Sequence, residues 1–273
     1  MIIGVCNATP LAACDRYEAT PFTSRDMRKR IDPSAVMAGV QSIVVLGVGR
    51  EYETNHCPSS QVQLSSLGTN PDYHPIVRAH LKNIVAELEQ QHGAFKHKIL
   101  VDSGTLDERA FAVRAGLGFI GRHGLVISPE FGTRFNIGLL LTTLPLELSC
   151  KNNCQCPQDC DMCIKICPTG ALRKGQPLDF SRCLSYLTQK KELNIDEEQL
   201  LAKGGQLYGC DICQNACKFN SIIEKTYVQP QKWLNKTDED FFNEYGNTAM
   251  LWQGADILRR NAKLICSFLQ SNY

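Results

Sequence analysis

The sequence predicts an α+β protein in which a domain of strands and helices precedes a domain of cysteine-rich loops. Two observations carry this prediction. Apolar runs typical of strands and one long helical pattern occupy the first half, and most of the 14 cysteines fall between Cys150 and Cys217. A length of 273 residues suits about two domains. We expect a first domain over 1–149, a cysteine-rich domain over 150–225 and a helical tail over 226–273.

Composition narrows the class of protein. The chain has 29 basic and 28 acidic residues, a balance that neither requires nor excludes a nucleic acid partner. No apolar run reaches the length of a membrane span, and the N-terminus shows neither a signal peptide nor a twin-arginine leader. We therefore expect no membrane partner and a reducing cytoplasm, where cysteines bind metal rather than form disulfides.

The first half opens with two expected strands. Ile2 to Cys6 is a short apolar run, and Ser42 to Val48 (SIVVLGV) is uninterrupted and β-branched, as buried strands are. Gly47-Val48-Gly49 lacks a third glycine at the spacing of a dinucleotide-binding loop, so that kind of site is not expected. The basic run from Arg25 to Arg30 is interpreted as a solvated helix face, with phosphate contact as the alternative.

A polar stretch and a long helix come next. Residues 51 to 72 are polar and contain prolines, which predicts an exposed loop. Apolar residues then recur at helical spacing until Gly93 ends the pattern. The apolar face of this helix consists of Val77, Leu81, Ile84, Val85 and Leu88.

Asp102 ends the apolar run Lys98-Ile-Leu-Val-Asp102 and precedes Ser103-Gly104. A carboxylate at the end of a buried strand is costly unless it is paired or functional, and strand ends often face ligand crevices. The alternative is a helix N-cap, because LDERAFAVRAGLG indicates a helix just afterwards. Position alone leaves both interpretations of Asp102 open.

The stretch from Ala115 to Gly124 (AGLGFIGRHG) holds four glycines. Glycine lets the backbone approach a flat ligand closely, and no Gly-Lys-Ser/Thr follows to indicate a phosphate loop. Leu125 to Ser128 and Asn136 to Thr142 are expected strands, and the Phe131-Gly132 turn predicts that they form a hairpin. Pro145 marks the boundary to the cysteine region.

The cysteines keep the rhythm of bacterial ferredoxins. A C-x2-C-x3-C-P run is followed by a lone cysteine and a second C-x2-C-x3-C. In such domains each of two 4Fe-4S clusters takes three thiolates from one set and the last cysteine of the other. We therefore expect a two-cluster bacterial-ferredoxin-like domain. The expected ligands are Cys156, Cys160, Cys163 and Cys217 for cluster one, and Cys167, Cys183, Cys210 and Cys213 for cluster two.

Other uses of the cysteines agree less well with their spacing. Zinc favours two separated CxxC pairs, often with His, whereas here four cysteines fall in one run that ends in Cys167-Pro168. The first ligand of cluster one stays open between Cys156 and Cys154, because Cys150 and Cys154 are spare in this run.

The end of the sequence loses the cysteine rhythm. Residues 226 to 247 are polar with aromatic anchors, and Ile257 to Leu269 (ILRRNAKLICSFL) predicts an amphipathic helix. The basic residues Arg259, Arg260 and Lys263 are most simply a solvated face, with phosphate contact as the alternative.

Several segments together resemble epoxyqueuosine reductases. They are VDSGTLDERAFAVRAGLGFIGRHGLVI, CDMCIKICPTGAL, SRCLSYLTQ and YGCDICQNAC, with Asp72-Tyr73-His74 as a further match, and the similarity runs from about Asp32-Pro33 to residue 220. The resemblance implies a nitroreductase-like cobalamin-binding domain before the two-cluster domain. It implies the last step of queuosine synthesis, reduction of the epoxide of epoxyqueuosine in tRNA. It also implies the cytoplasm, tRNA and an external electron donor.

The resemblance further implies roles for individual residues. Asp102 matches the family's proton donor, since breaking the C–O bond leaves an alkoxide that needs an acid within hydrogen-bond reach. Burial of this carboxyl group would keep it protonated near neutral pH. The clusters would deliver electrons singly to cobalt, while the protein supplies orientation, exclusion of water and a proton. The residues implied to approach cobalamin are Tyr73, Asp107, Glu108, Arg109, Val126, Ile137, Leu140, Ser185 and Thr188.

Some positions depart from the family pattern. Arg122-His123 stands where Lys-Asn is usual, and Lys218 stands where proline usually follows the last cysteine. Many members continue into a helical-repeat domain that helps to grip tRNA, and only ILRRNAK resembles its beginning, so weaker tRNA binding is expected. Two other functions stay open: a cobalamin-dependent reductase of a small molecule, related to reductive dehalogenases, and a non-catalytic iron–sulfur electron-transfer or cobalamin-handling protein.

Overall fold

The structure is a computed structural model. It describes residues 1–12, 22–50, 62–150, 154–220 and 226–271. None of the helices in this part of the chain combines the length and the apolar character that crossing a membrane requires.

Internal contacts divide the chain into two compact units. The first, unit 1, consists of Met1–Arg50 and His74–Cys160, and the second, unit 2, of Glu51–Tyr73 and Asp161–Tyr273. This division differs from the three parts expected from the sequence. The cause is long-range packing, because segments far before and far after the cysteines enter the core of unit 2.

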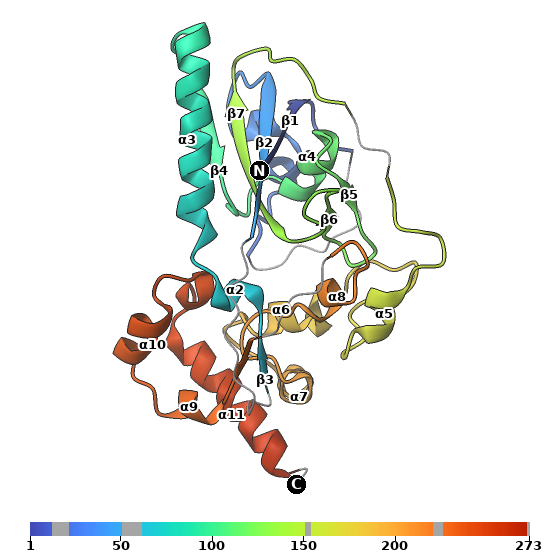
Figure 1. Ribbon diagram of the computed structural model, residues 1–273, viewed down its shortest axis with the longest axis vertical. Helices are drawn as coiled ribbons and strands as arrows, with labels where there is room; N and C mark the ends of the chain where they lie inside the picture. Colours follow the sequence, from blue (N-terminus) through green and yellow to red (C-terminus); the bar gives the residue numbers. More distant parts are fainter. Residues whose placement is uncertain (13–21, 51–61, 151–153, 221–225, 272–273) are drawn as a thin grey trace. The chain divides into compact units, whose positions relative to one another are not determined.

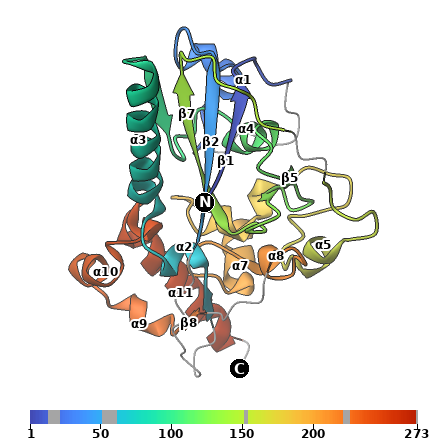
Figure 2. The same ribbon diagram turned by 45° about the horizontal axis from the view of Figure 1, so that its top comes forward.

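Unit 1 is built on an antiparallel sheet with the strand order β1 (Ile2–Asn7), β2 (Ser42–Gly49), β7 (Phe135–Thr142) and β4 (His97–Leu100) (Figure 1, Figure 2). The apolar runs predicted as strands are confirmed, and the middles of β2 and β7 are completely buried. The core of unit 1 lies where α4 (Glu108–Arg114) covers this sheet with Phe111.

The hairpin expected between residues 125–128 and 136–142 is wrong. Instead, β6 (Val126–Ile127) pairs with β5 (Phe119–Ile120). The residues of β7 are hydrogen-bonded to β2 on one side and to β4 on the other. Because both edges of β7 are already paired, β6 pairs instead with β5, which lies just before it in the sequence.

The long helix α3 (Tyr73–His92) confirms the predicted helical pattern and lies beside β4 and β7 (Figure 1). Its buried positions are Val77, Leu81 and Val85. A Cβ atom at Gly138 of β7 would lie 2.5 Å from Val77 Cγ1, so only glycine allows this close packing. Unit 1 also contains α1 (Met27–Ile31) and a 3-10 turn at Pro33–Ala35.

At both edges of the unit 1 sheet, few backbone N–H and C=O groups are open to pairing with a further strand. At the β1 edge, Val5 N–H donates to Ser149 Oγ at 2.9 Å, and Ser149 N–H donates to the Val5 carbonyl at 2.9 Å. At the other edge, β4 is four residues long and carries exposed His97 and Lys98. The sheet therefore ends on one covered strand and one short polar strand.

Unit 2 is mostly helical around an aromatic core. Trp233 packs with its ring centroid 5.4 Å from those of Phe241 and Tyr245. The loop expected over 51–72 contains β3 (Val62–Leu64) and α2 (Ser66–Thr69), while residues 51–61 lie outside the described residues. Pairing of β3 with the distant β8 (Thr226–Val228) explains why a local pattern missed this strand.

The last helix of unit 2 confirms the predicted amphipathic pattern, with Ile257, Ala262 and Ile265 buried. Two 3-10 turns, at Phe180–Arg182 and Ala249–Leu251, connect neighbouring helices. The helices are α5 (Met162–Ile166), α6 (Leu184–Leu187), α7 (Ile195–Gly204), α8 (Ile212–Asn215), α9 (Gln231–Leu234), α10 (Asp238–Tyr245) and α11 (Ala255–Ser271).

Candidate catalytic and cofactor sites

Asp102 lies in a strained turn just after β4. Among the described residues it is the one non-glycine residue with a positive φ, 45°, a conformation that side chains with a Cβ rarely adopt. Val101 is fully buried whereas Asp102 is exposed. The strand end thus brings a carboxyl group from the core to the surface, and the burial expected for Asp102 is not observed.

The N-cap of α4 is Asp107 rather than Asp102. Asp107 Oδ1 accepts the N–H of Ala110 at 3.3 Å. Arg30 and Arg109 each bring a guanidinium nitrogen to 4.0 Å from the Asp107 carboxylate, which is itself buried. Paired arginines offset the cost of burying this charge. The interpretation of Asp102 as a helix cap is therefore wrong. The interpretation of Arg30 as part of a solvated face is also wrong, because Arg30 is buried beside Asp107.

Glu108 carries a strongly perturbed carboxyl group. Burial raises the pKa of Glu108 from its usual value of 4.5 to about 8, and the negative charge of Asp102 adds to this shift. Glu108 Oε1 also accepts the N–H of Ser103 in a long hydrogen bond of 3.4 Å. At neutral pH, Glu108 is therefore mostly protonated and holds the backbone of the turn that carries Asp102.

The glycine-rich stretch forms the tight β5–β6 hairpin. A Cβ atom at Gly118 would lie 2.1 Å from a backbone carbonyl oxygen of β6, and one at Gly121 would lie 2.6 Å from the ring of His123. These glycines are required by the hairpin itself, whatever it binds. Arg109 Nη1 donates to the Gly124 carbonyl at 3.1 Å, which ties α4 to the tip of this hairpin.

His123 is buried at the hairpin tip. Its Nδ1 accepts the N–H of Leu125 at 3.2 Å, and burial lowers the pKa of His123 to about 4, so the ring is neutral with its proton on Nε2. His123 Nε2 and Asp107 Oδ2 are buried without a hydrogen-bond partner among the described residues. Such orphaned atoms are costly, and a bound ligand rich in amide groups would supply partners for both.

The other residues of unit 1 implied to approach cobalamin lie on strands. Val126 and Leu140 are buried, and Ile137 of β7 is half-buried. Val126 is part of the hydrophobic core of the unit, and Ile137 packs against that core. Their roles toward a cofactor stay a prediction.

The corresponding residues of unit 2 belong to two helices. Tyr73 begins α3, and Ser185 lies in the short helix α6. Thr188 is fully buried at the end of α6, where its hydroxyl accepts the N–H of Gly209 at 2.9 Å. The Thr188 side chain therefore has an internal partner, and its predicted approach to cobalamin is untested.

The thiols assigned to cluster two are near enough to shift one another's pKa. Burial raises the pKa of Cys210 to about 12, and negative charge on Cys183 and Cys167 would raise it further. Burial also raises the pKa of Cys213 well above its usual range, with Cys210 and Cys183 as further causes. Cys163, assigned to cluster one, also raises the pKa of Cys213, so sulfur atoms from several turns of the chain lie near one another. How these ligands divide between two clusters stays a prediction.

Hydrogen-bond donors surround two of these sulfur atoms. Burial acts to raise the pKa of Cys167, but hydrogen bonds from the N–H of Leu172 and from the hydroxyl and N–H of Thr169 lower this pKa overall. Thr169 Oγ1 lies 3.7 Å from Cys167 Sγ. At Cys183 burial raises the pKa although two N–H groups of α6 act the other way. Thiols with N–H donors directed at sulfur fit a 4Fe-4S cluster, whose potential depends on such bonds.

The thiols assigned to cluster one differ more in exposure. Cys163 is buried in α5, Cys156, Cys160 and Cys217 are half-buried, and the alternative ligand Cys154 is exposed. In the part of the chain that the structure describes, no three His, Cys, Asp or Glu side chains are placed to ligate a single metal ion. The choice between Cys156 and Cys154 stays a prediction.

Arg122, at a position that departs from the family pattern, contacts the segment before Cys160. Its Nη2 donates to the carbonyl oxygens of Pro157 and Gln158 at 3.1 and 2.7 Å. The two carbonyl groups lie between the expected ligands Cys156 and Cys160. Arg122 thus fastens this segment to the β5–β6 hairpin within unit 1.

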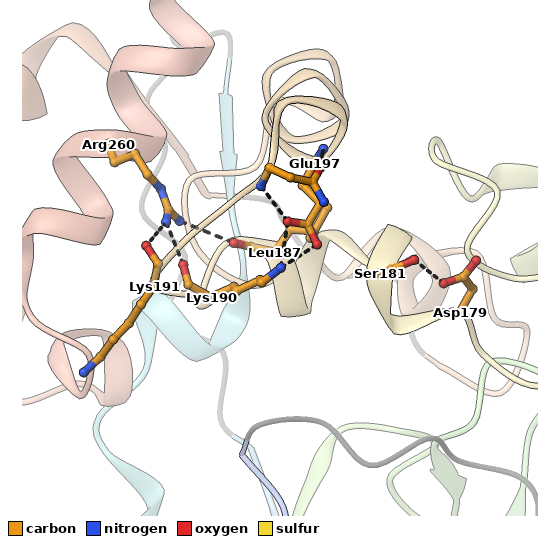
Figure 3. A network of polar contacts seen from close by, with 8 residues as sticks. Asp179, Ser181, Leu187, Lys190, Lys191, Glu197 and Arg260 are labelled. Carbon is orange, nitrogen blue, oxygen red and sulfur yellow. Dashed lines mark hydrogen bonds and ion pairs between the residues drawn. The ribbon is translucent and has the colours of Figure 1, made fainter.

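The arginines of α11 are engaged inside unit 2. Arg260 donates to the carbonyl oxygens of Lys190 and Lys191, each at 2.7 Å, and Lys190 Nζ lies 2.7 Å from both carboxylate oxygens of Glu197 (Figure 3). Arg259 donates to carboxylates of α10 and α11. The solvated-face interpretation is therefore corrected for Arg260, whose side chain holds unit 2 together, whereas Lys263 is exposed as that interpretation expects. Phosphate contact stays a prediction.

Sequence reasoning missed Asp211, which lies between two cysteines assigned to cluster two. Asp211 is buried, and its carboxylate accepts the N–H of Ser66 at 2.7 Å and Nε2 of Gln214 at 2.8 Å. An acidic residue inside CDIC was the available signal. Its partner Ser66 is 145 residues away in the sequence, which no local pattern shows.

Two family models match the sequence. A model described as "4Fe-4S double cluster binding domain" matches residues 155–220, and one described as "Epoxyqueuosine reductase QueG, DUF1730" matches residues 30–103. The two matches fall on the cysteine-rich segment and on the segment from the end of α1 through β4.

Curated relatives extend the similarity over most of the chain. The epoxyqueuosine reductase of Staphylococcus aureus is 33% identical over 262 residues, which cover 90% of this chain and 68% of that protein. The epoxyqueuosine reductase of Bacillus subtilis is 29% identical over 89% of this chain and 67% of its own length.

Solved structures share the fold. An epoxyqueuosine reductase solved with an epoxyqueuosine-modified tRNA-Tyr stem loop has a TM-score of 0.87 and 26% identity, over 98% of this chain and 78% of that chain. The enzyme of Bacillus subtilis, with its catalytic aspartate loop swung out of the active site, has a TM-score of 0.86, 26% identity and the same coverage. A catabolic reductive dehalogenase, 16% identical with a TM-score of 0.50 over 99% of this chain and 34% of its own, shares the fold alone.

Proposed function

This chain belongs to the epoxyqueuosine reductase family, and we propose that it reduces epoxyqueuosine to queuosine in tRNA. The observation that carries the proposal is the cysteine framework of unit 2. The thiols of Cys167, Cys183, Cys210 and Cys213 influence one another's pKa, and backbone N–H groups donate to the sulfur atoms of the first three. A protein that only stores metal does not need this control of cluster potential.

The proposed cofactors are two 4Fe-4S clusters and cobalamin. The clusters would be held by the crossed cysteine sets, and cobalamin by the nitroreductase-like unit 1. When bound, these groups supply the low-potential electrons that reduce the epoxide carbon. Support for cobalamin comes from the orphaned atoms His123 Nε2 and Asp107 Oδ2, because the amide side chains of a corrin offer both acceptors and donors.

The proton is assigned to Asp102. Breaking the epoxide C–O bond leaves an alkoxide oxygen, and a carboxyl group within hydrogen-bond reach can neutralise it. Asp102 presents its carboxyl group from a strained surface turn. Glu108, neutral near pH 7 because its pKa is about 8, accepts the N–H of Ser103 and so contacts the backbone of this turn.

The proposed reaction requires two partners besides the cofactors. The substrate tRNA and an external electron donor complete the reaction, and a cytoplasmic location follows because tRNA is the substrate. The residues implied to contact cobalamin, including Arg109 and Ser185, belong to the same proposal.

A reconstitution assay tests this function. The full chain is loaded anaerobically with iron, sulfide and cobalamin, then mixed with a reductant and a tRNA stem loop that carries epoxyqueuosine. Mass spectrometry of the nucleosides should show queuosine, and samples without cobalamin should show none. Stoichiometric zinc without sulfide would overturn the cluster assignment. Turnover of small epoxides without any turnover of tRNA would favour the small-molecule alternative.

A further inference from the structure

Asn261 of α11 bridges two stretches that carry ligands of cluster two. It is fully buried, and its Nδ2 donates to the carbonyl oxygens of Thr188 and Leu207, each at 2.8 Å. Thr188 ends the short helix α6, which begins directly after Cys183. Leu207 lies three residues before Cys210. One amide group therefore sets the spacing between the two stretches.

The amide of Asn261 is held in this orientation. Its Oδ1 accepts Nη2 of Arg260 at 2.8 Å and Nε of Arg260 at 3.2 Å, so both ends of the amide have partners. Arg260 in turn donates to the carbonyl oxygens of Lys190 and Lys191, just after α6 (Figure 3). The bridge is thus supported by a second side chain of the same helix.

A second polar link joins the same two stretches. The hydroxyl of Thr188 accepts the N–H of Gly209 at 2.9 Å and donates to the carbonyl oxygen of Ser185 at 3.2 Å. Gly209 directly precedes Cys210. The two links lie within one unit and differ in chemistry, so they can be removed one at a time.

We propose that Asn261 is a positioning residue for cluster two and that it acts with Thr188 to fix the Cys183 stretch against the Cys210–Cys213 loop. The inference rests on the proposed function for its clusters. A buried carbonyl that loses its donor pays a desolvation penalty, and replacing Asn261 would leave two such carbonyls. α11 is therefore part of the cluster-binding apparatus rather than a tail.

The test measures cluster two on its own. In the full chain, a Cys160→Ala background removes a ligand of cluster one, so that the remaining signal reports cluster two. Asn261→Ala, Thr188→Val and Thr188→Ser are compared with Asn243→Ala, an exposed asparagine of α10. After anaerobic reconstitution, EPR follows the reduced cluster, and iron release to a chelator gives the rate of its loss.

We expect Asn261→Ala to lose cluster two roughly tenfold faster and to shift its EPR signal. Thr188→Val should show a smaller effect in the same direction. Thr188→Ser keeps the hydroxyl and should behave like the parent, as should Asn243→Ala. In a chain with all its cysteines, cluster one should keep its signal.

The inference is overturned if Asn261→Ala and Thr188→Val both leave the loss rate and the EPR signal unchanged. Equal acceleration at both clusters also overturns it, since that indicates a general loosening. If Asn261→Ala does not fold by circular dichroism, the Thr188 pair decides: loss that depends on the hydroxyl supports the inference, and equal behaviour overturns it. A parent chain without iron and sulfide overturns the proposed function, and this inference with it.

Discussion

The turn at Asp102 and the cysteine framework of cluster two are built in opposite ways. The turn exposes Asp102 in a positive-φ conformation, and the Gly104 carbonyl within it accepts the N–H of Ser24 at 2.6 Å. The framework carries four half-buried cysteines and is fastened by short hydrogen bonds through the buried residues Asp211 and Thr188. The turn therefore presents its carboxyl group at the surface, whereas the polar links of the framework lie inside unit 2.

This difference matches the two tasks that the proposed reaction sets. A proton donor must reach its acceptor and then give way to product, so an exposed turn suits it. Cluster ligands must keep their geometry while the charge changes, so a rigid framework suits them. A solved structure of the Bacillus subtilis relative has its catalytic aspartate loop swung out of the active site.

The largest expected effect is a loss of turnover without a loss of cofactor binding when Asp102 is replaced. Asp102→Asn should lower single-turnover reduction of the tRNA epoxide roughly a hundredfold to ten-thousandfold, because the amide cannot donate a carboxylic proton. Asparagine tolerates positive φ, so the turn itself should persist. Cobalamin binding and iron content, measured on the same samples, should stay unchanged. Near-normal turnover would remove Asp102 from the mechanism.

The second prediction concerns the rigid region. Cys213→Ala should remove about half of the iron and sulfide and lower the melting temperature by about 5 °C, because the framework loses the cluster that crosslinks it. Cys160→Ala should also remove about half of the iron, with a smaller change in melting temperature. Iron analysis and thermal melts of the anaerobic proteins measure both effects. Equal melting shifts would contradict the contrast between the two sets.

The third prediction is a pH dependence at the turn. The pKa of Glu108 is about 8 in the folded protein and has its usual value of 4.5 in the unfolded chain. At pH values between these two, Glu108 is ionised in the unfolded chain but protonated in the folded one. The unfolded state binds fewer protons in this window, so the free energy of unfolding falls as pH rises. Glu108→Gln should remove this contribution and flatten the curve. Denaturant unfolding at several pH values measures it, and parallel curves for both proteins would contradict it.

The smallest effect is expected inside the framework. Thr169→Val removes the hydroxyl that lies 3.7 Å from Cys167 Sγ and keeps the shape of the side chain. Donors to cluster sulfur favour the reduced state, so the potential of cluster two should become more negative while that of cluster one is unchanged. A redox titration followed by EPR resolves the two. An unchanged potential would mean that the backbone N–H groups alone set it.

Sequence patterns predicted the parts of the fold that depend on one element at a time. The helical spacing at Val77 and Leu81, the β-branched run of β2 and the amphipathic face of α11 each indicate burial of a single segment, and all are confirmed. The cysteine rhythm predicted the double-cluster domain in the same local way. Such patterns record which residues are buried.

Partners far apart in the sequence escaped prediction. The pairing of β3 with β8 joins Val62 to Val228, and the bridge of Asn261 joins residues 54 and 73 positions away. The positive φ of Asp102 is a backbone property that residue type alone does not report. These features follow from three-dimensional packing, and they are the ones that shape the proposed sites.

The edges of the unit 1 sheet bear on how the protein behaves in concentrated samples. An open edge strand is a template on which another chain can add a strand, and repeated addition leads to fibrils. Here Ser149 pairs with Val5 at the edge of β1, and β4 offers only four residues, of which Lys98 donates its Nζ to the Val36 carbonyl at 3.3 Å. Spectroscopy of the clusters requires high protein concentration, and this sheet gives a neighbouring molecule little backbone on which to begin aggregation.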